Sequence, residues 1–159
     1  MIIGGEEVYL YSPFDVKRWT EEEIEKEVGS LLKKYNPKAN AMFEFADDIE
    51  ILANIMYLYG EMVSRLENEY SIKKLEVDYL EAKEVRDLRK RWSETTSDKA
   101  PAMSYFEAEA KVKVKEERQK ALDIQSQSRR FKYAYNSFEE KINALKKKMD
   151  AIKFEEFGQ

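Results

Sequence analysis

Helix-breaking residues are nearly missing from two long stretches of this sequence, and this constrains the fold more than any other feature. Residues 40–92 include no proline and a single glycine, Gly60, and residues 105–154 include neither. Glycine and proline are the residues that most often end or bend a helix. With 5 glycines and 3 prolines in 159 residues, the chain also lacks the turn formers of a β-sandwich or barrel. The sequence therefore predicts an all-α fold.

The predicted architecture is a long antiparallel helical hairpin, similar to a coiled coil, within a single domain. A short strand or extended arm is expected at 8–11. The chain is expected to divide into an N-terminal arm and short helix at 1–38, a long helix at 39–92, a loop of small polar residues at 93–103 and a second long helix at 104–157.

Two sequence motifs predict where helices begin. Thr20 and Glu23 fit a capping box, in which each side chain accepts a hydrogen bond from the backbone N–H of the other residue. This short helix should stop before Pro37, because proline disfavours helical geometry in the residue that precedes it. Ser104 and Glu107 have the same spacing and predict the start of the last helix.

Apolar residues on both long helices recur at alternating steps of four and three, as the seam of a coiled coil requires. The first seam falters at Lys73 and Lys74, which predicts a local adjustment of the supercoil. Residues 111–115 alternate lysine and valine with the period of a strand, but this segment is short and is predicted to be helical. The first seam comprises Phe45, Ile49, Leu52, Met56, Tyr59, Val63, Leu66 and Tyr70, then Val77, Leu80, Val85, Leu88 and Trp92; the second comprises Val114, Ala121, Ile124, Ser128, Phe131, Tyr135, Phe138, Ile142, Leu145, Met149 and Ile152.

Residues 49–63 carry more apolar side chains than one seam needs. Ile51, Ile55 and Leu58 lie outside the seam positions, and a stripe this wide must face more than one partner helix. A hairpin of two helices buries only one narrow seam per arm, so the rest of the stripe would stay uncovered. We therefore expect the chain to close this stripe by forming a homo-oligomer.

The sequence has no histidine and no cysteine. This excludes catalytic centres that use either residue, as well as zinc fingers and disulfides. Glu44 with Asp48, and Asp47 with Glu50, have helical spacings that could share a divalent ion, but carboxylate sites of this kind in helical bundles also use histidine. No glycine-rich phosphate loop or other catalytic motif is present. We expect a non-enzymatic protein without a metal or another cofactor.

The sequence also predicts where the protein is found in the cell. No stretch approaches the ~20 apolar residues of a membrane helix, and the first residues lack the basic start and apolar run of a signal sequence. Together with the lack of cysteine, this predicts a cytoplasmic protein with no membrane partner.

The net charge of −4 hides a strong asymmetry along the chain. Residues 1–60 carry −6, residues 61–110 carry −3 and residues 111–159 carry +5. An antiparallel hairpin brings two basic clusters together next to its loop, and their summed field attracts a polyanion. With Trp92 as a stacking ring, these residues form the predicted nucleic-acid-binding site. The clusters are Arg86, Arg89, Lys90 and Arg91 on the outgoing helix and Lys111, Lys113, Lys115 and Arg118 on the returning helix.

Each of these features has a structural alternative. A run of charges on a long helix is often only a solvated face, and Trp92 could instead close the seam at the end of the hairpin. The basic run that includes Tyr133, and the lysines at 146–148, face the same two interpretations. Phe131 and Tyr135 fall on the second seam and are expected in the core.

The C-terminal half of the chain resembles a known family. Residues 85–92 read VRDLRKRW, and after a small polar loop the long helix ends in INALKKKM at 142–149. This arrangement resembles the phage recombination mediators of the UvsY-like family, over roughly residues 70–154. The resemblance implies a viral protein that binds single-stranded DNA in the host cytoplasm and assembles as an oligomer. It also implies partners in DNA recombination, namely a recombinase that the protein helps to load and a single-strand-binding protein that is displaced.

The same hairpin also fits a second class of function, a non-enzymatic protein–protein interaction module. Examples are a phage inhibitor of a host or defence complex and an assembly adaptor. In this interpretation the acidic N-terminal portion is the working surface and mimics a nucleic acid. Asp47, Asp48 and Glu50 are the acidic residues that we assign to that surface.

Overall fold

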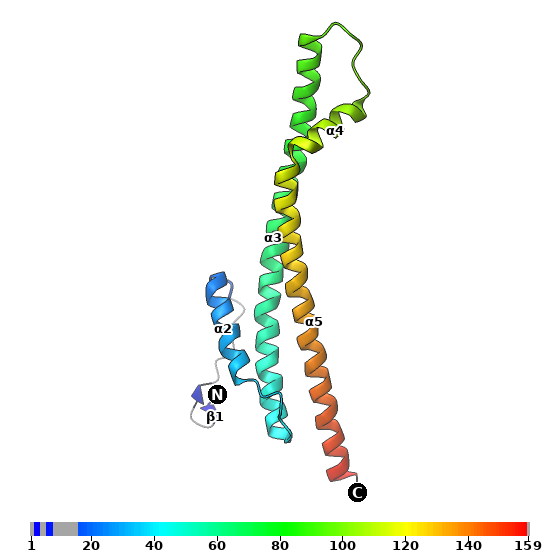
Figure 1. Cartoon of the computed structure of the whole chain (residues 1–159). Coiled ribbons are helices and arrows are strands. Elements are labelled where there is room, and N and C mark those ends of the chain that lie inside the picture. Colours follow the sequence, from blue (N-terminus) through cyan, green and yellow to red (C-terminus); the bar gives the residue numbers. More distant parts are fainter. Residues whose placement is uncertain (1, 4–5, 8–15, 159) are drawn as a thin grey trace. The chain divides into compact units, whose positions relative to one another are not determined.

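The computed structural model of the chain describes residues 2–3, 6–7 and 16–158. The helices confirm the all-α prediction, and the strand expected at 8–11 lies outside the described residues. Two very short strands, β1 (Ile2–Ile3) and β2 (Glu6–Glu7), pair antiparallel. The helices are α2 (Glu21–Lys34), α3 (Met42–Thr95), α4 (Met103–Lys113) and α5 (Lys115–Phe157) (Figure 1).

The helices pack into two compact units. The first, here called the three-helix unit, comprises Met1–Val63 and Arg130–Gln159, and the second, the hairpin unit, comprises Ser64–Arg129. The long helices α3 and α5 contribute to both units. Within the described part of the chain, no helix has the length and apolar character needed to cross a membrane.

The start of α2 confirms the first capping box, whereas the second is wrong. The Thr20 hydroxyl accepts a hydrogen bond from the Glu23 backbone N–H at 3.2 Å, and the Glu23 carboxylate accepts one from the Thr20 N–H at 2.7 Å. Helix α2 ends at Lys34, ahead of Pro37 as predicted. Helix α4 begins at Met103, and Ala102 precedes it without a side-chain cap. Ser104 therefore lies inside the helix.

Three helices share one hydrophobic core in the three-helix unit. Leu52, Ile55 and Leu58 of α3 are fully buried in it. The wide stripe of α3 is thus covered inside one chain, and our expectation that it stays uncovered is wrong. The apolar face of α2 covers the side of the stripe that α5 leaves open. Helix α2 supplies Ile24, Val28 and Leu31 to this core, and α5 supplies Ile142 and Leu145 with Phe131, Phe138, Met149 and Ile152 at its margin.

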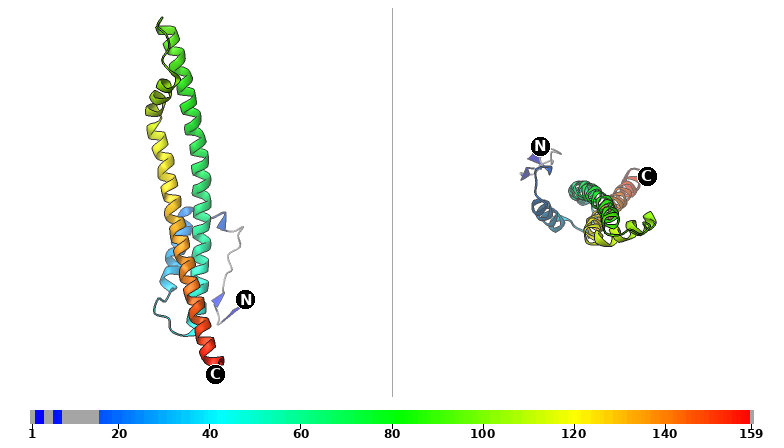
Figure 2. Two further views of the ribbon diagram at one scale, coloured as in Figure 1. Left: turned by 90° about the vertical axis from the view of Figure 1, so that its right-hand side faces the viewer. Right: turned by 90° about the horizontal axis from the view of Figure 1, so that it is seen from above.

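In the hairpin unit, α3 and the start of α5 lie side by side and run antiparallel (Figure 2). Half-buried Lys73 follows Tyr70 at the regular step of three, so the seam does not falter there. The spacing changes at Val77 instead, because the step of four from Lys73 is followed by a second step of four to Glu81. The seam then continues to Glu84 and Leu88, while Leu80 points outward with 39% of its surface exposed. Charged residues therefore occupy seam positions that we expected to be apolar.

The last helix is interrupted once, which corrects the prediction of an unbroken helix at 104–157. Val114 separates α4 from α5 with φ −95° and ψ 9°, outside the helical region. Figure 1 shows the bend between the two helices. Val112 is 71% exposed and Val114 is buried, so only Val114 of this lysine–valine segment faces the interior. β-branched valines are weak helix formers, which favours a break at this point.

The end of α3 also differs from the prediction. The helix continues past Trp92 to Thr95, and the loop begins at Thr96. Ser93 and Thr95 were assigned to the loop because they are small and polar. Their hydroxyls instead donate hydrogen bonds to the carbonyls of Lys90 and Arg91, at 2.8 and 2.7 Å, which is compatible with helical geometry.

Candidate nucleic-acid interface

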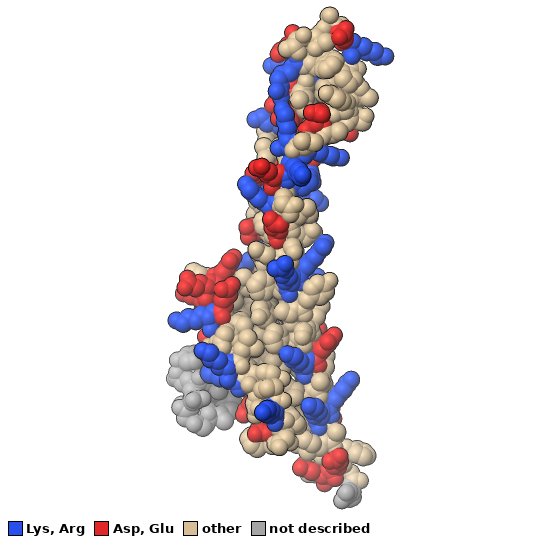
Figure 3. All heavy atoms as spheres, viewed as in Figure 1, with Lys and Arg blue, Asp and Glu red and all other residues tan. Residues whose placement is uncertain are grey.

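The predicted site residues all belong to the hairpin unit. They come from the last turns of α3, from the end of α4 and from the start of α5. Figure 3 shows Lys and Arg side chains gathered near the loop of this unit, with acidic side chains among them. The antiparallel packing thus brings the two clusters to one end, as predicted. In the structure, α3 carries Arg86, Arg89, Lys90, Arg91 and Trp92, α4 carries Lys111 and Lys113, and α5 carries Lys115 and Arg118.

A single carboxylate holds two of these cations. Glu84 Oε1 accepts a hydrogen bond from Lys113 Nζ at 2.6 Å and one from Arg91 Nη2 at 3.0 Å. The hydrogen bond from Lys113 is the main cause of a lowered pKa at Glu84, and Arg91 adds to it. Glu84 therefore stays ionised and neutralises charge that we had assigned to nucleic acid.

Arg118 and Lys90 also have acidic partners. Arg118 contacts Glu81 closely and has Asp78 at 3.7 Å, so it bridges α5 to α3. Lys90 approaches Glu94 at 4.0 Å, and both side chains are more than half exposed. An exposed pair at that distance contributes little to stability, and a competing anion can replace Glu94 easily.

The remaining cations of the site point to solvent. Arg86, Arg89, Lys111 and Lys115 are exposed, and none forms an ion pair with a residue that the structure describes. Charges of this kind can bind an external anion without first giving up an internal partner. Among the predicted site residues, these four cations remain available.

Trp92 lies differently from the predicted stacking ring. It is half-buried, and its ring meets Phe106 edge-to-face with the centroids 6.4 Å apart. Its indole Nε1 is buried and has no hydrogen-bond partner among the described residues. This position fits the alternative in which Trp92 closes the end of the seam. The part of its side chain that stays exposed borders the depression described next.

Beside Trp92 there is a shallow depression of about 360 Å³. The sequence does not indicate this depression directly, because two of its walls come from the loop and from α4. Phe106 could have been found from its four-residue spacing to Ala110 and Val114, both buried, whereas Ala100 carries no signal. The depression is lined by Arg86, Arg89, Lys90, Trp92, Ser93, Ala100 and Phe106.

The other basic and aromatic residues divide between core and surface. Phe131 packs at the edge of the core with its ring 5.4 Å from that of Tyr59, as predicted. Tyr133 is 74% exposed. Lys148 places its ammonium group 5.8 Å from the centre of the Phe45 ring. Because Tyr133 and the basic residues beside it are exposed, they form a second surface that combines cations with an aromatic ring.

Two of the four carboxylates considered for a metal ion have structural roles. Glu44 accepts hydrogen bonds from the backbone N–H groups of Asn40 and Ala41, at 2.9 and 3.0 Å, which caps α3 and lowers the pKa of Glu44. Buried Asp48 accepts one from the Asn36 N–H at 2.9 Å and so fixes the α2–α3 connection. Among the described residues no cluster of three or more His, Cys, Asp or Glu side chains could hold a metal.

Comparison with known proteins adds no assignment. No protein family, no curated protein and no solved structure matches this chain. The resemblance to recombination mediators therefore stays a prediction.

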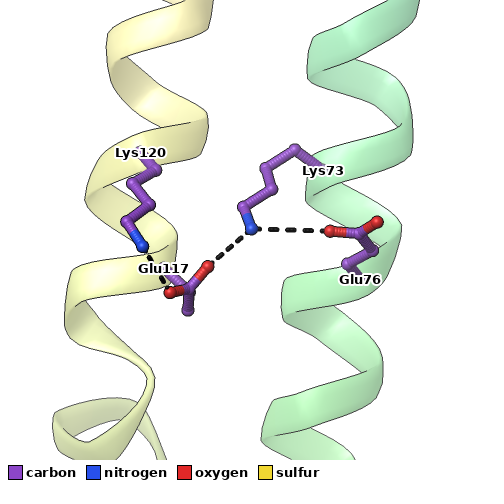
Figure 4. A network of polar contacts seen from close by, with 4 residues as sticks. All are labelled: Lys73, Glu76, Glu117 and Lys120. Carbon is purple, nitrogen blue, oxygen red and sulfur yellow. Dashed lines mark hydrogen bonds and ion pairs between the residues drawn. The ribbon is translucent and has the colours of Figure 1, made fainter.

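Below the basic cluster, a charged network joins α3 to α5 (Figure 4). Lys73 Nζ donates to Glu117 at 2.5 Å and lies 3.4 Å from Glu76. Lys120 donates to the other oxygen of Glu117 at 2.7 Å. The hydrogen bonds from Lys120 and Lys73 lower the pKa of Glu117 to about 2.

This pKa predicts acid sensitivity of the hairpin unit. A carboxylate whose pKa is lowered by folding stabilises the fold above its unfolded pKa of 4.5, and this contribution is lost as pH falls toward 2. We expect Glu117→Gln to lower the melting temperature at pH 7, and the difference from wild type to shrink steadily between pH 5 and pH 2. Exposed Glu116 provides the matched control, Glu116→Gln. Equal melting temperatures for wild type and Glu117→Gln at pH 7 would contradict the role of this network.

Proposed function

We propose that this protein is a non-enzymatic recombination accessory protein that binds single-stranded DNA through the loop end of its hairpin unit. The observation that carries the proposal is the set of exposed cations there without internal partners, Arg86 and Arg89 above all, beside a depression with an aromatic floor. Cations next to rings are the combination that proteins use to bind single strands without sequence preference.

The charge of the hairpin unit supports binding that is local and sensitive to salt. The unit contains 15 basic and 14 acidic residues, so it has almost no net charge. Attraction must come from nearby groups, because screening limits surface fields to ~10 Å at moderate salt. Weak binding by one chain becomes strong when an oligomer presents several such ends to one strand.

An exposed apolar stripe on α3 supports self-association. Ile72, Leu75 and Tyr79 are 53%, 70% and 63% exposed, and their spacing of three and four places them on one helical face. This stripe, rather than the buried one at 49–63, is the surface that a second copy would cover. In this proposal the oligomer holds the strand, helps a recombinase to load and displaces a single-strand-binding protein.

The DNA-binding proposal is tested by fluorescence anisotropy with a labelled oligo-dT at several salt concentrations. Each phosphate contact to a single strand contributes about −0.7 to the slope of log affinity against log salt. We expect the double variant Arg86→Ala/Arg89→Ala to weaken binding and to make the slope shallower by roughly 1.4, because two contacts are lost.

The matched control removes the same charge elsewhere. Lys146→Ala/Lys147→Ala takes two exposed lysines from the far part of α5 and should leave affinity and slope nearly unchanged. Wild type that shows no salt-sensitive binding at low salt would contradict the proposal. Equal loss in both double variants would also contradict it, because binding would then follow total charge.

Self-association is tested by light scattering over micromolar concentrations. We expect the mass of wild type to rise with concentration and Leu75→Glu to stay monomeric, because a charge in the stripe opposes its burial. Leu122, 47% exposed on α5, provides the control Leu122→Glu, which should behave as wild type. A monomeric wild type at all concentrations would show that the stripe is not an interface.

The exposed acidic residues favour the second candidate, a protein–protein interaction module. Glu21, Glu22 and Glu23 form the exposed first turn of α2, and Asp47 and Glu50 are exposed on α3. The acidic surface cannot include Asp48, which is 2% exposed and bonded to the α2–α3 connection. If wild type binds no strand at low salt, this candidate becomes the better account.

A further inference from the structure

We propose that the depression beside Trp92 is a pocket for one nucleotide of the bound strand, with the base on its aromatic floor and the phosphate on its cationic rim. The inference rests on the proposed function and deepens it. If the inference is right, this site binds the bases of the strand as well as its phosphates.

The rim has the geometry of a phosphate site. Arg86, Arg89 and Lys90 are spaced by three and four residues, so their side chains rise from one face of α3. Neither arginine has an ion pair with a described residue, and the partner of Lys90 is 4.0 Å away and exposed. Arginine binds phosphate oxygens through two parallel N–H donors, which fixes orientation as well as charge.

The floor has the chemistry of a base site. Trp92 and Phe106 meet edge-to-face, and Phe106 is only 3% exposed, so a base would lie against the floor rather than between the rings. Trp92 also carries a buried N–H without an acceptor among the described residues. Because this nitrogen is covered by the protein, a base in the depression would be held by contact with the rings and not by a hydrogen bond to it.

The size of the depression limits what it can take. Its volume of about 360 Å³ is near the lower end of the ~300–1,000 Å³ range of small-ligand sites. That suits one nucleotide unit and leaves the neighbouring nucleotides outside. Ala100 forms part of the wall from the loop, and its small side chain leaves the space open.

A substitution at Ala100 tests the pocket without removing any charge. Ala100→Leu fills the depression from an exposed loop position and should not disturb the helices. Ala108→Leu is the matched control, because Ala108 is exposed on α4 and does not line the depression. Both variants are made in a Trp19→Phe background, so that Trp92 is the only tryptophan.

Each protein is titrated with an oligo-dT and with an abasic strand of equal length. We expect Ala100→Leu to weaken binding of oligo-dT by about tenfold, the value of one stacked base, and to leave binding of the abasic strand unchanged. Oligo-dT should quench Trp92 fluorescence in Ala108→Leu and not in Ala100→Leu.

Two outcomes would overturn the inference, and they are distinguishable. In the first, both variants bind oligo-dT with equal affinity and bind the abasic strand as tightly as oligo-dT. This would show that the protein holds only phosphates, which contradicts the nucleotide pocket but not the proposed function. If the Trp19→Phe parent binds neither strand, the proposed function fails and the pocket fails with it.

Discussion

Ion pairs across the seam of the hairpin unit decide both how its helices pack and which of its charges face outward. Lys73 with Glu117, Glu81 with Arg118 and Glu84 with Lys113 replace apolar contacts between α3 and its returning partners. A partly buried pair of this kind adds little net stability, but removing one partner leaves the other without compensation. Each pair also joins fixed positions on two helices and so opposes slippage. Two of these pairs also occupy cations that were predicted to bind nucleic acid, Lys113 and Arg118.

Much of the fold could be predicted from the sequence because it is local or periodic. The Thr20 cap and the second seam follow from short-range hydrogen bonding and from the apolar repeat, and both agree with the structure. The charged stretch of the first seam could not be predicted in this way, since a lysine such as Lys73 is normally assigned to the surface. Packing between segments that lie far apart in the sequence could not be predicted either. Nothing near Leu52 indicates that α2 covers that part of α3.

At the candidate site, too, contacts between different helices could not be predicted from the sequence. The sequence shows how many cations lie near the loop, but it does not show which of them are neutralised. Arg91 pairs with Glu84 two turns earlier on its own helix, whereas Lys113 reaches the same oxygen from α4. Such pairings depend on the register between helices. They reduce a cluster of eight expected cations to a smaller set around one depression, which narrows where a strand can bind.

The central claim is that a single strand binds at this depression and not along the exposed part of α5 near Tyr133. Photocrosslinking with an oligonucleotide that contains 5-iodouracil, followed by peptide mapping, tests it most directly, because this base reacts with nearby aromatic side chains. The account predicts crosslinks in peptides that contain Trp92 or Phe106. Crosslinks confined to Tyr133, which is 74% exposed beside its own basic run, would contradict it.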